Sequence, residues 1–118
     1  MIELVLSKRC IECDKCVQAC PTDVFDAVPG APLVIARQSD CQTCFMCELY
    51  CPVGALYVDP NCHRPVDTRE SEITETDWPE QYRRDSGWGR ARRTHPNESW
   101  RMNEIFAAAR DILQEDTR

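Results

Sequence analysis

Eight of the nine cysteines in this chain fall into two runs with the same spacing. The first run spans residues 10–21 and the second spans residues 41–52, and both read C-x2-C-x2-C-x3-C-P. Every cysteine of the second run lies 31 residues after its counterpart in the first. Deprotonated cysteine is a strong ligand of soft and borderline metal ions, so the repeated pattern predicts metal binding.

The spacing within each run suits a compact inorganic core. The first three cysteines, on a looping backbone, can wrap around three corners of one cubane. The fourth is followed by proline, begins the next turn and points away. Structural zinc is the alternative, because CxxC pairs also build zinc ribbons. Zinc needs only two cysteines from each run, however, and leaves the third and fourth unexplained.

The two runs, and the residues around them over roughly the first sixty positions, resemble bacterial ferredoxins that carry two [4Fe–4S] clusters. In that family the fourth cysteine of each run ligates the other cluster. The resemblance therefore implies a first cluster held by Cys10, Cys13, Cys16 and Cys51. It implies a second cluster held by Cys41, Cys44, Cys47 and Cys20. Both runs keep their middle cysteine, so we expect two four-iron clusters and no three-iron cluster.

Short strands and helices must hold the two loops in place. Aliphatic and β-branched stretches predict strands at residues 2–6, 24–28, 33–36 and 55–58. Residues 14–19 predict a short helix that ends at Cys20-Pro21, and residues 29–32 predict a turn. This order indicates an internal β-α-β repeat. We therefore expect an α+β fold, with two antiparallel hairpins and two small helices around the clusters.

A change of composition near Pro60 divides the chain into a two-cluster domain, residues 1–60, and a tail, residues 61–118. The tail begins with an arm, residues 61–96, that is acidic and then basic and has too few apolar residues for a core of its own. We expect this arm to lie extended on another surface. Residues 97–115 predict an amphipathic helix with Asn97 as its N-cap. Its apolar stripe comprises Met102, Ile105, Phe106, Ala109, Ile112 and Leu113.

Length and charge narrow the class of protein. A chain of 118 residues accommodates one small domain and an extension, and small domains often depend on a bound metal for stability. The net charge of −6 argues against a nucleic-acid surface. The N-terminus lacks the pattern of a signal peptide, and no apolar run has the length of a membrane span. We therefore expect a cytoplasmic location, where thiols stay reduced and available for iron.

Three further residues with metal-binding or redox chemistry lie outside the two runs. Cys62 matches no ligand position of the ferredoxin family, and we interpret it as a free thiol. A redox or intersubunit role for Cys62 is the alternative. His63 and His95 are isolated, and we interpret both as surface or interface residues.

The function that the ferredoxin resemblance implies is one-electron transfer. No catalytic acid–base pair, nucleophile site or substrate pocket is recognisable, so we expect no enzymatic activity of the chain by itself. The layout also resembles the β-subunit of adenylylsulfate reductase, a two-cluster domain whose C-terminal tail clasps a flavoprotein. This resemblance implies an electron-transfer subunit that is bound through residues 61–118 to a catalytic partner carrying FAD.

Aromatic residues and arginines in the tail favour the same interpretation. Trp78, Tyr82, Trp88 and Trp100 alternate with arginines, and both residue types are enriched at protein interfaces. The alternative is a free, diffusible, low-potential ferredoxin. An apolar stripe on the final helix would be a liability for such a monomer, which favours the subunit.

Overall fold

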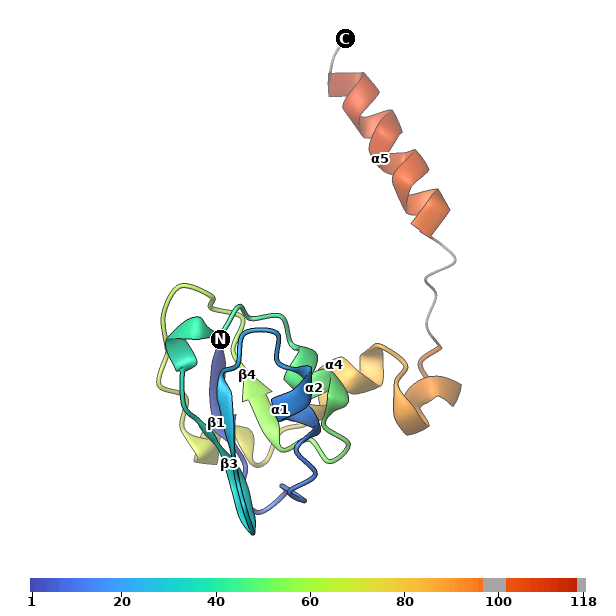
Figure 1. Ribbon diagram of the computed structural model, residues 1–118. Helices are drawn as coiled ribbons and strands as arrows, with labels where there is room; N and C mark the ends of the chain where they lie inside the picture. Colours follow the sequence, from blue (N-terminus) through green and yellow to red (C-terminus); the bar gives the residue numbers. More distant parts are fainter. Residues whose placement is uncertain (97–101, 117–118) are drawn as a thin grey trace.

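The computed structural model describes residues 1–96 and 102–116, and their arrangement is shown in Figure 1. The N-terminal unit contains two antiparallel pairs of strands. Strand β1 (Ile2–Val5) pairs with β4 (Leu56–Val58), and β2 (Phe25–Val28) pairs with β3 (Ala31–Ile35). Only β2 and β3 form a hairpin, because β1 and β4 come from opposite ends of the unit. The expectation of two hairpins was therefore wrong for one of the two pairs.

The turn between β2 and β3 is shorter than predicted. It consists of Pro29 and Gly30, and Gly30 has a φ of 70°, which glycine adopts without steric cost. The next residues, Ala31 and Pro32, already belong to β3. Proline is tolerated there because β3 is an edge strand of a two-stranded sheet.

Each cysteine run contains a short helix. Helix α1 (Lys15–Ala19) ends at Cys20, and α2 (Met46–Tyr50) ends at Cys51. Both of these cysteines have extended backbone, which the following proline favours. The order strand–helix–strand thus occurs twice, as β1-α1-β2 and β3-α2-β4, with a 3-10 helix, η1 (Gln38–Asp40), before the second run.

The core of this unit surrounds the cysteine loops. Its buried members include Ile2, Phe25, Leu33, Leu56 and Val58, packed together with the thiols of three cysteines, Cys16, Cys47 and Cys51. The cysteines therefore belong to the interior of the domain as well as to its surface. A change in what they bind must affect the packing of the whole unit.

The expected extended arm is wrong in part, because residues 61–96 contain three helical segments. These are α3 (Glu70–Ile73), α4 (Trp78–Asp85) and the 3-10 helix η2 (Gly89–Arg93). Helix α4 packs against α2 and β4 (Figure 1). Ile73 is fully buried in a second small core with Leu6 and Tyr57. Ile73 and the buried Pro79 of the arm thus pack against the N-terminal unit, and this burial stabilises helices too short to persist alone.

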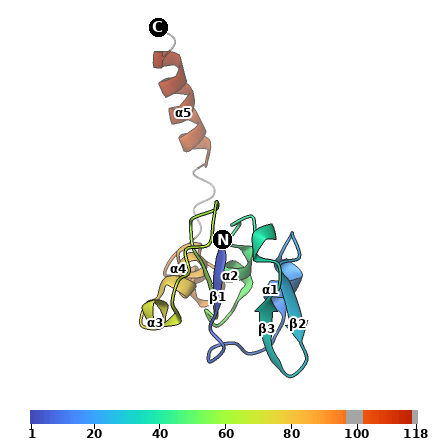
Figure 2. The ribbon, with the colours of Figure 1, turned by 90° about the vertical axis from the view of Figure 1, so that its left-hand side faces the viewer.

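The last helix, α5 (Met102–Asp116), stands apart from the other elements (Figures 1 and 2). Its side chains Ile105, Phe106, Ile112 and Leu113 are 54–64% exposed. The predicted N-cap Asn97 and the beginning of the predicted helix lie outside the described residues. Within residues 1–96 and 102–116, no helix has the length and apolar character needed to cross a membrane.

Candidate metal centres

Two small cavities in the N-terminal unit are each lined by four cysteines. The first contains Cys10, Cys13, Cys16 and Cys51. The second contains Cys41, Cys44, Cys47 and Cys20. These are the same two groups of four that the ferredoxin resemblance implies, with the last cysteine of each run facing the cavity of the other run. We call them the Cys10-side cavity and the Cys41-side cavity.

The backbone of the two loops repeats an uncommon conformation. Glu12 and Asp14 have φ values of 60° and 57°, and their counterparts Thr43 and Phe45 have values of 54° and 62°. Residues other than glycine adopt this left-handed region at a cost in free energy. Its recurrence at the same positions turns each loop so that successive cysteines face one cavity.

Backbone N–H groups donate hydrogen bonds to the sulfurs in both halves. Glu12 and Thr43 donate to the first sulfur of their own run, Cys10 Sγ and Cys41 Sγ, each at 3.4 Å. Val24 donates to Cys20 Sγ at 3.4 Å, and in the second half Ala55 donates to Cys51 Sγ at 3.3 Å. Such bonds stabilise the thiolate form and, in iron–sulfur sites, set the reduction potential.

Two further contacts to sulfur occur only in the Cys41-side cavity. The N–H group of Ile2 donates to Cys41 Sγ at 3.3 Å. The Thr22 hydroxyl lies 3.8 Å from Cys20 Sγ and shares a hydrogen bond with it. Among the described residues, the equivalent positions Leu33 and Val53 make no such bond to a cysteine. The Cys41-side cavity therefore offers more hydrogen bonding to its sulfurs.

The thiols differ in how readily they lose a proton. Burial raises the pKa of Cys16 to about 12, and burial raises the pKa of Cys47 as well. Burial opposes ionisation of Cys20 too, but hydrogen bonds from Val24 and its neighbours prevail and lower the pKa of this thiol. Because a bound metal core stabilises thiolates, Cys16 and Cys47 depend on the metal for deprotonation more than Cys20 does.

The donor set fits a core of several metal ions. Among the residues that the structure describes, no three His, Cys, Asp or Glu side chains converge to hold a single metal ion. The four sulfurs of each set instead surround a cavity. Soft thiolates are the ligands that iron–sulfur clusters use, and the N–H donors supply the surrounding hydrogen bonds.

The other candidate residues lie away from both cavities. Cys62 is exposed and lines neither cavity. His95 lies at the surface, where its Nδ1 is 2.9 Å from the Thr94 hydroxyl and its Nε2 is 3.8 Å from an Asp85 oxygen. His63 is exposed as well.

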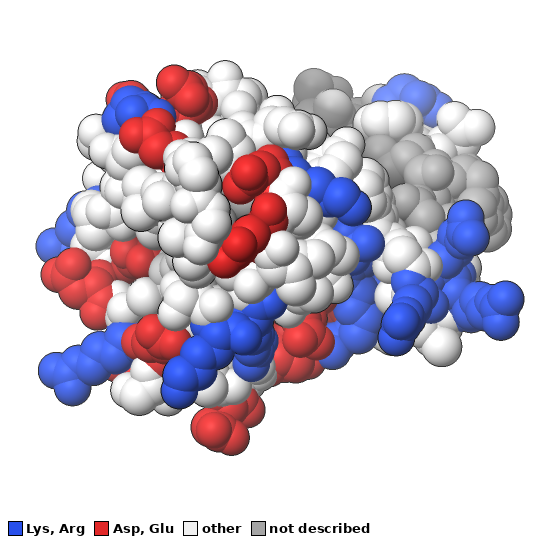
Figure 3. All heavy atoms as spheres, turned by 60° about the horizontal axis from the view of Figure 1, so that its bottom comes forward, with Lys and Arg blue, Asp and Glu red and all other residues white. Residues whose placement is uncertain are grey.

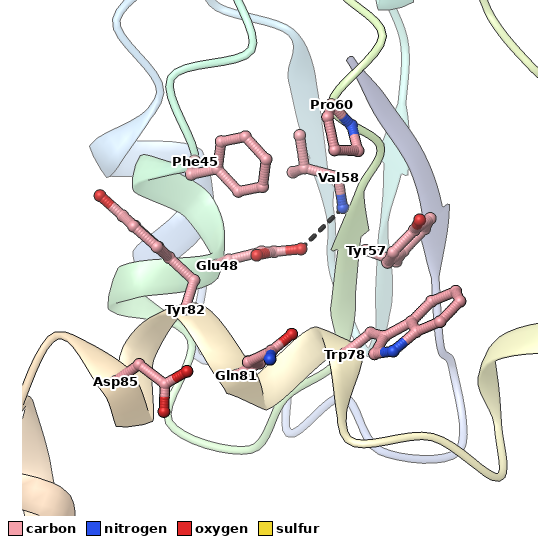
Figure 4. A pocket seen from close by; sticks show the side chains of 9 residues that line it. All are labelled: Phe45, Glu48, Tyr57, Val58, Pro60, Trp78, Gln81, Tyr82 and Asp85. Carbon is pink, nitrogen blue, oxygen red and sulfur yellow. Dashed lines mark hydrogen bonds between the residues drawn. The ribbon is translucent and has the colours of Figure 1, made fainter. Parts of the chain in front are cut away.

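One residue close to the Cys41-side cavity was missed by the sequence analysis. Glu48 is only 2% exposed, and its Oε1 accepts a hydrogen bond of 2.7 Å from the Val58 N–H group. Burial raises the pKa of this carboxyl to about 8. The available signal was an acidic residue within the otherwise apolar residues 45–50. Its environment is drawn in Figure 4.

Comparisons with known proteins agree with this chemistry. Residues 9–56 match the family model of the 4Fe-4S dicluster domain. An uncharacterized ferredoxin of Methanocaldococcus jannaschii is 47% identical over 49 residues, which are 42% of this chain and 77% of that protein. A ferredoxin of Methanothermococcus thermolithotrophicus is 43% identical over 47 residues, which are 40% of this chain and 77% of that protein.

Longer proteins contain a similar segment. The ferredoxin-type protein NapG of Haemophilus influenzae is 41% identical over 59 residues, covering 42% of this chain but 21% of that protein. No solved structure matches the chain. With two sets of four cysteines and two ferredoxins that it matches over most of their length, this chain belongs to the ferredoxin family of iron–sulfur electron carriers and carries two [4Fe–4S] clusters.

Proposed function

We propose that this chain is the electron-transfer subunit of an oxidoreductase and that it exchanges single electrons with a flavin-containing catalytic subunit. The observation that carries this proposal is the exposed apolar stripe of α5, which includes Ile105, Phe106, Ile112 and Leu113. An amphipathic helix with an uncovered apolar face is suited to binding a groove on another protein. The layout of the tail, which resembles that of the adenylylsulfate reductase β-subunit, supports a flavoprotein carrying FAD as this partner.

Within this proposal, each cluster has four cysteine ligands taken from both runs. The proposed ligands of one cluster are Cys10, Cys13, Cys16 and Cys51. The proposed ligands of the other are Cys41, Cys44, Cys47 and Cys20. The shared cavities and the repeated N–H donors to sulfur support both sets. When bound, each [4Fe–4S] cluster accepts and releases one electron at a time.

The protein's own contribution is to enclose the clusters and leave limited points of access. Cys16, Cys47 and Cys51 are buried, whereas Cys13 and Cys44 are exposed. Electrons can enter or leave most directly where a partner approaches an exposed ligand. We therefore assign the surfaces around Cys13 and Cys44 as the two sites of electron exchange.

The tail, residues 61–118, is the proposed partner-binding region, and its arginines support this assignment. Arg90, Arg92 and Arg93 of η2 are exposed and form no ion pair with any described residue. On the face drawn in Figure 3, Lys and Arg side chains gather at the right-hand end. Trp88 holds η2 near α2 through an edge contact with Tyr50, with ring centroids 5.1 Å apart. A partner can thus contact arginines beside the two-cluster unit.

A free, diffusible ferredoxin is the second candidate function. It is favoured by the two ferredoxin relatives that match this chain over 77% of their length, since most of each relative corresponds to the two-cluster unit alone. In either case we propose a reducing compartment, the cytoplasm, because the cysteines must remain available to iron.

Anaerobic purification of the tagged, full-length chain from its native cells distinguishes the electron-transfer subunit from the free ferredoxin. We expect a stoichiometric protein with bound flavin to co-purify. Phe106→Ser combined with Leu113→Ser should abolish this association, because both changes remove apolar contacts from the exposed stripe. Ala107→Ser combined with Asp111→Ser, on the opposite face of α5, should leave it intact. Recovery of the cluster-loaded wild-type chain alone would favour the free ferredoxin.

A further inference from the structure

An aromatic pocket of about 480 Å³ adjoins the Cys41-side cavity. It lies between α4 on one side and α2 with β4 on the other (Figure 4). Phe45 and Val58 line both the aromatic pocket and the Cys41-side cavity. A molecule in the aromatic pocket would therefore be separated from the site of the second cluster by little more than these two side chains.

Two pairs of aromatic rings form opposite walls of the pocket. Tyr57 and Trp78 are stacked, with ring centroids 6.2 Å apart, and Phe45 and Tyr82 are tilted, with centroids 5.4 Å apart. In Figure 4 the two pairs lie on either side of Glu48. The faces of aromatic rings carry negative electrostatic potential and attract cations.

The acidic groups of the pocket strengthen this preference. Glu48 accepts a hydrogen bond from the Val58 N–H group, but it has no cationic partner among the described residues. Asp85, at the rim, already bonds to Arg84 at 3.1 Å and lies 3.8 Å from the His95 ring. Among the residues that the structure describes, the lining of the pocket includes no lysine, arginine or histidine. Glu48 and Asp85 thus contribute carboxyl oxygens to an otherwise mainly aromatic lining, and these oxygens can accept hydrogen bonds from a cationic donor.

We propose that the aromatic pocket receives the guanidinium group of an arginine from the redox partner, and so holds that partner beside the Cys41-side cluster. The identity of the occupant rests on the proposed function, whereas the affinity for a guanidinium does not. Guanidinium is planar, is weakly hydrated and stacks on aromatic faces, and its fork of N–H groups matches a carboxylate.

Calorimetric titration of the anaerobic, cluster-loaded, full-length chain tests the pocket directly. The probe is N-acetyl-arginine methylamide, and the matched neutral probe is N-acetyl-citrulline methylamide. We expect the arginine probe to bind at least about tenfold more tightly, because citrulline keeps the shape of the side chain and lacks the charge. Equal binding of the two probes, or binding of neither, would overturn the proposal.

Substitutions in the pocket identify the side chains that bind the arginine probe. Glu48→Gln keeps an oxygen that can accept the Val58 hydrogen bond, so we expect it to fold and to weaken arginine binding about tenfold. Trp78→Leu should weaken it severalfold through loss of an aromatic face. Glu75→Gln, an exposed acidic position outside the pocket, serves as the control and should have no effect. Unchanged affinity in Glu48→Gln and Trp78→Leu would place the probe elsewhere and refute the pocket.

Binding measurements with the flavoprotein partner test the pocket separately from the proposed function. We expect Glu48→Gln to lower the affinity for the flavoprotein about tenfold, and the double change in the α5 stripe to abolish binding. If the flavoprotein binds Glu48→Gln as tightly as wild type, the pocket does not receive the partner, although the subunit function stands. If no flavoprotein is found, the subunit function fails and with it the assigned occupant, whatever the probe does.

Discussion

The two cysteine-lined cavities share a backbone but differ in their surroundings. Their loops have the same left-handed positions and the same N–H donors to sulfur at a separation of 31 residues. Ile11 in the Cys10-side cavity is replaced by Gln42 in the Cys41-side cavity, and Asp14 is replaced by Phe45. The repeat therefore sets which sulfurs meet, and the side chains between the cysteines set the environment of each site.

The tail increases this difference because an aromatic ring of α4 packs against the wall of the Cys41-side cavity. Tyr82 of α4 contacts Phe45, which lines the Cys41-side cavity, and no equivalent ring contacts Asp14 among the described residues. Glu48 likewise has no acidic counterpart, because the residue 31 positions earlier is Val17. Two sites with one ligand pattern thus acquire different polarity and different access for partners.

Removal of iron should have the largest effect, because it should abolish the folded structure of both cysteine-lined sites. Chelation under reducing conditions is expected to unfold both halves together, because Cys16, Cys47 and Cys51 are part of one core. Far-ultraviolet circular dichroism, followed alongside the visible absorbance of the clusters, measures this loss. Retention of native-like secondary structure after complete loss of iron would contradict it.

Exchange of the fourth ligand is tested by single cysteine changes. Cys51→Ala lies in the second run but should affect the cluster of the Cys10-side cavity, and Cys20→Ala should affect the other cluster. Each change should cost up to about four irons per chain. Iron analysis and electron paramagnetic resonance of the remaining cluster measure the outcome. If each change instead affects the cluster of its own run, the ligand sets are not exchanged. Cys62→Ala is the control and should retain both clusters.

Substitution of Glu48, which has no acidic counterpart in the first half, should change the free energy of unfolding. Glu48→Ala leaves the N–H group of Val58 buried without an acceptor, which should lower the free energy of unfolding by about 1–3 kcal/mol. Glu48→Gln retains an acceptor and should cost less. Denaturant unfolding of the cluster-loaded chain measures both. Equal losses in the two variants would show that the hydrogen bond is not the cause.

The smallest expected effect is on the reduction potential. Thr22→Val makes the Cys41-side cavity more like the other, since the counterpart of Thr22 is Val53, and removes the hydroxyl contact to Cys20 Sγ. We expect the potential of that cluster to fall by about 20 mV, equivalent to about 0.5 kcal/mol for one electron. Redox titration followed by electron paramagnetic resonance measures it. The Cys10-side cluster serves as an internal reference whose potential should not change.

Much of the N-terminal unit could be predicted from local patterns. The prolines after Cys20 and Cys51 mark the ends of α1 and α2, and aliphatic stretches mark the four strands within a few residues. The arm could not be predicted in the same way. Helix α3 is a single turn, and its one buried residue, Ile73, packs with Leu6, which follows β1, and with Tyr57 of β4. A helix of this length is not stable in isolation, so the local sequence does not predict it.

The sequence by itself determined the metal chemistry, because cysteine spacing is a local property and thiolate ligation depends on residue type. Only the tertiary structure decided what surrounds each site. Burial of Glu48, the pairing of Phe45 with Tyr82 and the pocket between α4 and β4 all join residues far apart in the chain. Such contacts depend on which apolar surfaces meet when the chain folds, and that is a property of the whole molecule.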